Sequence, residues 1–143
     1  MPSSASTNLE KWNAYHIWCA DYTPPHHQKC ICIVPSLEWF LFINSNPPVG
    51  RLARQYALSI SSFEMQFLTH QSFMYPAKRI FTDDRVAKSI ADPKNCFGHI
   101  GPSLIKKIEG MIASNPSLND DEKKTMIGSN PASPTSANTP SNP

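Results

Sequence analysis

The 143-residue sequence has little charge of either sign and no long hydrophobic run. Charged residues make up 17% of the chain and the net charge is +2, so bulk charge does not indicate a polyanionic partner, and nucleic-acid binding would require locally clustered cations. The longest apolar run, residues 37–43, contains Glu38 and is too short to cross a bilayer. Residues 1–12 have neither the basic nor the apolar region of a signal peptide. These absences predict a cytoplasmic protein with no membrane partner.

Cysteine is also scarce: the sequence contains Cys19, Cys30, Cys32 and Cys96. No two of them form a CxxC pair, which argues against a redox motif of that type. Cys30 and Cys32 are two residues apart in a strand-like alternation, so their thiols would share one face and the alternating isoleucines the other. We expect reduced, mostly buried thiols and no disulfide framework.

Alternation and short apolar runs predict a series of β-strands. The strands are expected at residues 14–22, 29–34, 39–45 and 55–61, with a last strand or pair of strands at 72–83. Residues 23–28 and 46–55, which contain several prolines and the two adjacent histidines, are expected to be loops. Pro76 would restrict the last strand to an edge or a bend.

Helical patterns occur mainly in the second half of the sequence. Glu64 follows Ser61 at the spacing of a capping box, which predicts a short helix with Phe63 and Phe67 one turn apart on the same side. From Ser103, residues 104, 105, 108, 111 and 112 form one apolar stripe, and residues 115–127 contain a weaker helix start. The order of elements predicts an α+β domain, a small β-barrel or curled sheet with helices at one end.

We place this domain at residues 11–127, between a flexible leader (1–10) and a tail (128–143). The tail has no charge and no large apolar side chain, and such a composition predicts disorder.

The segment HHQKCICIV, residues 26–34, is the richest in reactive side chains. A zinc site is one interpretation, but His26, His27 and the two cysteines lack a second, separated ligand pair. A nucleophilic cysteine is another, since Cys30 adjoins Lys29, but the alternation favours burial of the thiol. Neither interpretation is favoured.

Phosphate chemistry is the third interpretation. Lys29 and the two histidines, with Arg51 and Arg54 from the next loop, could line a groove for a polyanion. The candidates for base stacking are Tyr22, Trp39 and Tyr56. RNA cleavage without a metal needs a base for the 2′-hydroxyl, a cation for the phosphate and a donor for the leaving oxygen. The residue types permit this chemistry, although solvated loop charges would give the same pattern.

The order of several segments resembles the MazF/PemK-type toxin family. The segments are HIWCADY, KCICIV, FLFINS, FLTHQSFM, RIF and GHIGPSLIKKIEGMI, within residues 15–113. The resemblance implies an SH3-like β-barrel, a homodimer, cleavage of single-stranded RNA without metal or other cofactor, and an antitoxin partner. It places Lys29 where the family has its catalytic arginine and Ser45 where it has a threonine or serine.

Two functions follow from this resemblance. The first is a toxin-like, metal-independent endoribonuclease, with Lys29 for phosphate charge, His27 as general acid or base, and Ser45 as hydrogen-bond donor. His26, Arg51 and Arg54 would bind and steer the RNA. The second is a non-catalytic member of the same fold that binds a protein or nucleic acid in a phage or defence context. The departures from the family pattern, Lys29 for arginine and His70-Gln71 for an acidic position, keep the second function open.

Overall fold

The structure is a computed structural model that describes residues 9–65 and 68–128. The strands are β1 (Asn13–Cys19), β2 (His26–Val34), β3 (Trp39–Asn44), β4 (Leu58–Ile60), β5 (Ser72–Arg79) and β6 (Cys96–His99). The helices are α2 (Arg51–Tyr56), α3 (Arg85–Ile90), α4 (Pro102–Ser114) and α5 (Asp120–Gly128), with short 3-10 helices η1 (Pro35–Leu37) and η2 (Pro93–Asn95). The predicted α+β class is therefore confirmed.

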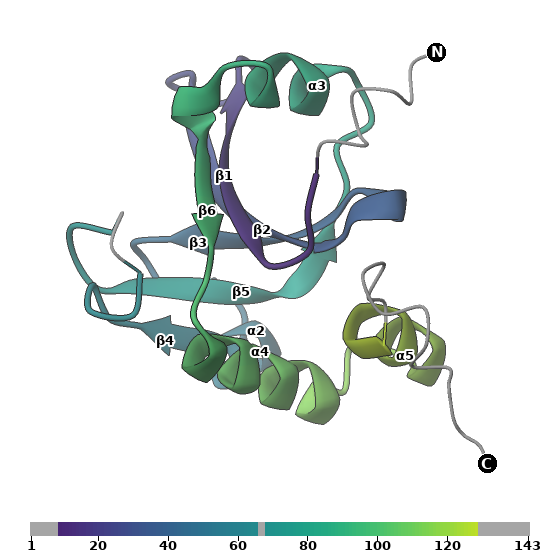
Figure 1. The fold of residues 1–143 in the computed structure, drawn as a ribbon. Coiled ribbons are helices and arrows are strands. Elements are labelled where there is room, and N and C mark those ends of the chain that lie inside the picture. The colour runs from purple at the N-terminus through teal and green to yellow at the C-terminus, as the bar shows by residue number, and fades with distance from the viewer. Residues whose placement is uncertain (1–8, 66–67, 129–143) are drawn as a thin grey trace.

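The six strands form one antiparallel sheet in the order β4-β5-β3-β2-β1-β6. The sheet curls into a half-barrel, so that β1 and β6 run across the direction of β4 and β5 (Figure 1). Strands β4 and β6 each have one neighbour and form the two edges. This arrangement agrees with the predicted curled sheet, but the helices do not lie at one end of it, since α4 and α5 contribute to one core and α3 to the other.

Residues 30–34 of β2 are buried on both faces, because the curled sheet is covered on each side there. Ile31 and Ile33 pack into a larger core that includes side chains of α4 and α5. Cys30 and Cys32 pack into a smaller core with residues of α3. All four cysteines are free. The thiols of Cys19, Cys30 and Cys32 are buried and that of Cys96 is exposed, which agrees with the expectation of mostly buried thiols.

Helices α4 and α5 follow the sequence prediction closely. The apolar stripe of α4 packs against the sheet through Leu104, Ile108 and Ile112, which are buried. Helix α5 starts with a reciprocal capping box: the Glu122 N–H donates to Asn119 Oδ1 at 2.8 Å, and the Asn119 N–H donates to Glu122 Oε1 at 2.9 Å.

Several local predictions were wrong. His26–Gln28 belong to β2, because they pair with Ile17–Cys19 of β1, and the second half of the expected 46–55 loop forms α2. The predicted capping bond from the Ser61 N–H to Glu64 Oε1 is present, but residues 62–64 form a turn instead of the expected helix. Phe63 is 96% exposed, and Phe67 lies outside the described residues. The expected last strand ends at Arg79, and α3 and β6 follow it.

Pro76 lies at a bend of β5. The pairing of β5 with β3 shifts between Ile43↔Met74 and Leu41↔Lys78, and β4 pairs only with residues 72–74. No ladder hydrogen bond is therefore lost at the position without an N–H.

In the ranges 9–65 and 68–128, none of the helices has the length and apolar character that crossing a membrane would require.

Candidate functional site

A small pocket lies where β2 begins, β3 ends and the chain enters β5. Its volume is about 190 Å³, and its lining is His26, His27, Gln28, Lys29, Ile43, Asn44, Ser45, His70 and Ser72. Drug-sized ligands need about 300 Å³ or more, so this pocket suits a group of the size of a phosphate or a single ring.

The structure brings together four of the six residues singled out in the sequence. His26, His27, Lys29 and Ser45 all line the pocket. They meet because β2 starts beside the end of β3, with Lys29 paired to Ile43. Arg51 and Arg54 are exposed on α2 and do not line it.

The sequence analysis missed the contribution of the segment before β5. His70 and Ser72 reach the pocket because β5 pairs with the end of β3, with Phe73 opposite Asn44. The signals in the sequence were a cluster of polar side chains at the start of a predicted strand and the resemblance, which sets His70-Gln71 at an acidic position of the family pattern. Sheet order decides which strand starts are neighbours, and the sequence pattern did not specify it.

The pocket has a positive electrostatic character. Lys29 is half-buried in its wall, and the lining contains no Asp or Glu. A cation in a concave site without a nearby carboxylate attracts anions more strongly than one on an open surface. The site is therefore suited to a phosphate oxygen.

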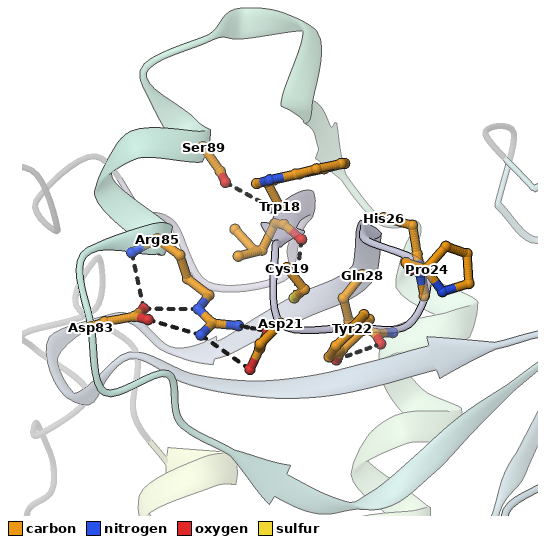
Figure 2. A network of polar contacts seen from close by, with 11 residues as sticks. Trp18, Cys19, Asp21, Tyr22, Pro24, His26, Gln28, Asp83, Arg85 and Ser89 are labelled. Atoms are coloured by element: carbon orange, nitrogen blue, oxygen red, sulfur yellow. Dashed lines mark hydrogen bonds and ion pairs between the residues drawn. The ribbon is translucent and has the colours of Figure 1, made fainter.

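A buried amide supports the pocket from below. Gln28 is 4% exposed, and its Nε2 donates to the Ile43 carbonyl and to Asn44 Oδ1, both at 3.1 Å. Its Oε1 accepts a hydrogen bond from the Tyr22 hydroxyl at 3.1 Å (Figure 2). These bonds tie the start of β2 to the end of β3. They hold Asn44 with its side-chain oxygen toward Gln28.

His26 is held by the loop before β2. Its Nδ1 donates to the Pro24 carbonyl at 2.7 Å, and its ring packs on Tyr22 at 4.8 Å between centroids (Figure 2). One ring nitrogen of His26 is thus occupied, as is Nδ1 of His70, which lies 3.0 Å from the Thr69 hydroxyl.

His27 lies among other rings. His16, on β1, stacks on it at 5.4 Å, and Trp18 approaches it edge-on at 5.0 Å. Burial and, to a smaller extent, the nearby His27 and Lys29 together lower the pKa of His16 to about 4. His16 is thus neutral at pH 7, and its Nε2 is buried without a partner among the described residues.

The zinc and cysteine interpretations lose support. Cys30 and Cys32 pack into the smaller core, while the ring of His27 lies on the opposite face with His16 and Trp18. In the described part of the chain, no group of three or more His, Cys, Asp or Glu side chains could hold a metal ion. Burial raises the pKa of the Cys30 thiol well above its usual value, which removes the thiolate that a nucleophile requires.

A separate charged cluster joins α3 to the loop after β1. Arg85 donates from Nε to Asp83 Oδ1 at 2.8 Å and from Nη1 to Asp21 Oδ1 at 2.9 Å (Figure 2). The Arg85 hydrogen bonds lower the pKa of Asp83 to about 2. The charges of Arg85, Asp83 and Asp21 are paired with one another, so this cluster attaches α3 to the loop after β1.

The pocket thus combines three imidazoles, those of His26, His27 and His70, with one ammonium group and two hydroxyls. Imidazoles transfer protons near neutral pH, and an ammonium group stabilises negative charge on phosphoryl oxygens. Scans against protein-family models, curated proteins and solved structures found no match to this chain.

Proposed function

We propose that this chain is a metal-independent endoribonuclease that acts on single-stranded RNA. The observation that carries the proposal is the meeting of His27, His70 and Lys29 in one pocket whose lining has no carboxylate. Cleavage by the RNA's own 2′-hydroxyl needs a base, an acid and a cation, and these three side chains provide that set. Compared with the sequence prediction, His70 is the added member.

The reaction follows from these roles. One imidazole of the pair His27 and His70 removes the proton of the 2′-hydroxyl, and the 2′-oxygen forms a bond to phosphorus. The bond from phosphorus to the 5′-oxygen breaks, and the other imidazole, protonated at the start, gives its proton to that oxygen. The products are a 2′,3′-cyclic phosphate and a 5′-hydroxyl, with no water consumed. Lys29 and the Ser45 hydroxyl stabilise the charge on the phosphoryl oxygens.

The fold and the partners belong to the same proposal. The curled half-barrel would be a variant of the SH3-like barrel of the MazF/PemK type, and the chain would act as a cytoplasmic homodimer controlled by an antitoxin protein. Arg51 and Arg54, on the exposed side of α2, would contact RNA beyond the pocket. A short, unrelated reading frame beside the gene, encoding a small acidic protein, would support this assignment.

The experiment compares an end-labelled single-stranded RNA with its 2′-deoxy counterpart in the presence of EDTA. The proposal predicts that the RNA is cut to products with 2′,3′-cyclic phosphate ends and that the 2′-deoxy strand stays intact. Cutting of both strands, or cutting that EDTA abolishes, would contradict the mechanism.

A non-catalytic binding function is the second candidate, and one observation favours it. The lining has a lysine and no arginine, and a lysine binds phosphate as a point charge without the two-pronged geometry of arginine. This function predicts salt-dependent binding of RNA by the intact protein, with no cleavage at any pH between 5 and 8.

A further inference from the structure

Four aromatic rings form a continuous row, and one of them, His27, lines the pocket. Trp18 and His27 are paired across β1 and β2, with ring centroids 5.0 Å apart. His16 stacks on His27 at 5.4 Å, and Phe97 of β6 meets His16 edge-on at 4.6 Å. The row therefore crosses three neighbouring strands, β2, β1 and β6.

Both ends of this aromatic row are accessible. Trp18 is 44% exposed and Phe97 is 37% exposed, although both are large apolar side chains. Phe97 also lines a second pocket, of about 310 Å³, together with Phe63. The row thus presents ring surface to solvent on either side of His16.

The backbone at Trp18 is fixed from the other side of β1. The Trp18 N–H donates to Ser89 Oγ of α3 at 2.9 Å, and α3 is anchored by the Arg85 cluster. Trp18 also lines a separate pocket of about 190 Å³, whose lining includes Arg85 and Lys88 together with Asp83 and Asp84. A ring on a fixed backbone loses little conformational entropy when a planar ligand stacks on it.

The chemistry of the adjoining pocket indicates which planar ligand fits. Lys29 and the absence of any carboxylate in the lining complement a phosphate. Aromatic rings beside a cationic groove are the combination with which proteins bind single-stranded nucleic acids, because every base has a face that can stack. In a duplex the bases are covered by their neighbours, so only unpaired bases can use the row.

We infer that Trp18, His16, His27 and Phe97 form a stacking subsite for unpaired bases that flank the phosphate held at Lys29. This inference rests on the proposed function for its RNA substrate, and it names the feature by which single strands are selected. Trp18, which is more exposed than Phe97, contributes most to binding.

The test uses 2′-O-methyl oligouridine, which cannot be cleaved through its 2′-oxygen, and an oligomer with the same backbone but no bases. Fluorescence anisotropy measures the affinity of the full chain for each. We expect oligouridine to bind at least about tenfold more tightly than the abasic strand. Trp18→Ala should lower the affinity for oligouridine by about 5- to 100-fold and leave the affinity for the abasic strand unchanged.

Two further variants separate stacking from loss of folding. Trp18→Phe keeps a ring and should retain most of the affinity, whereas Leu37→Ala, at an apolar side chain of similar exposure on η1, should bind as the wild type does. Equal binding of the two oligomers, or equal weakening of both by Trp18→Ala, would overturn the inference. Binding that depends on bases and on Trp18, but without cleavage of unmodified RNA, would support it and refute the ribonuclease function.

Discussion

At the residue scale, the neutral His16 is the clearest consequence of the way the sheet curls. It lies between His27, Lys29 and Phe97, where a positive charge is disfavoured by burial and by the neighbouring basic groups. The sequence predicted the chemistry of His27 and Lys29 from their types and positions. It did not predict His16 or His70 as their neighbours, because strand pairing determines those contacts.

We predict that His16 makes the protein less stable in acid. The unfolded chain binds a proton at the ordinary histidine pKa of 6.5, whereas folded His16 does so only near pH 4. Between these values the unfolded state holds more protons, so the free energy of unfolding decreases as the pH falls from about 6.5 to about 4. Over this pH range the free energy of unfolding of His16→Phe should decrease by about 1–2 kcal/mol less than that of the wild type, after allowance for solvent screening.

Urea unfolding of both proteins across this pH range measures the effect. His99→Gln, at an exposed histidine of β6, is the control and should follow the wild type. Parallel pH dependence of wild type and His16→Phe would show that His16 is protonated as easily in the folded state as in the unfolded state.

A second prediction concerns the buried amide beneath the pocket. Gln28→Ala removes the donor to the Ile43 carbonyl and to Asn44, and it leaves a cavity and unpaired polar atoms. The loss of stability should be about 2–4 kcal/mol in urea unfolding. Gln55→Ala, at an exposed position of α2, should change stability by less than about 0.5 kcal/mol. A similarly small effect at Gln28 would mean that the network does not hold β2 to β3.

At the element scale, the accuracy of prediction follows the length and periodicity of each segment. Helix α4 has an apolar stripe that repeats over three turns, and it was predicted to within a residue of its start. Helix α3 has six residues and β6 has four, all of them exposed in β6, so neither has enough of a repeat to be recognised. Gly98, at a φ of 91°, interrupts β6 further.

Helix α5 is tied to the sheet by one buried lysine. Lys11, which is 8% exposed, donates from Nζ to the Ile33 carbonyl at 3.0 Å and to the Met126 carbonyl near the end of α5. A cation at the C-terminal end of a helix also interacts favourably with the helix dipole. Burial nevertheless lowers the pKa of Lys11 to about 8.

We predict that Lys11→Met releases α5 from the sheet. Hydrogen exchange of the α5 amides should become about tenfold faster, because the helix loses its bond at Met126, while amides of β2 and β3 change less. Lys106→Met, at an exposed lysine of α4, is the matched control and should leave α5 unchanged. Unchanged exchange in Lys11→Met would show that the other contacts of α5, the packing of Met126 and the Lys78–Glu122 ion pair among them, hold the helix without Lys11.

At the scale of the whole molecule, the curled sheet explains why the site could be only partly predicted. The two cores, one on each face, follow from the alternation in β2 and from the stripe of α4. The pocket depends on three chain segments that are distant in sequence, residues 26–29, 43–45 and 70–72, and only the sheet order brings them together. Residue types indicated the candidate chemistry, and the sheet order adds His70 and Ser72 to the pocket lining.

The central claim is that His27 transfers a proton during cleavage of single-stranded RNA. Its most direct test is the cleavage rate of a labelled RNA in EDTA by the wild type and by His27→Gln, with the affinity of each for the uncleavable 2′-O-methyl strand measured in parallel. We predict a rate at least about a hundredfold lower for His27→Gln, an affinity within about threefold of the wild type, and no change in either quantity for Lys106→Gln. Cleavage by His27→Gln at the wild-type rate would contradict the account, as would a wild-type protein that does not cut RNA.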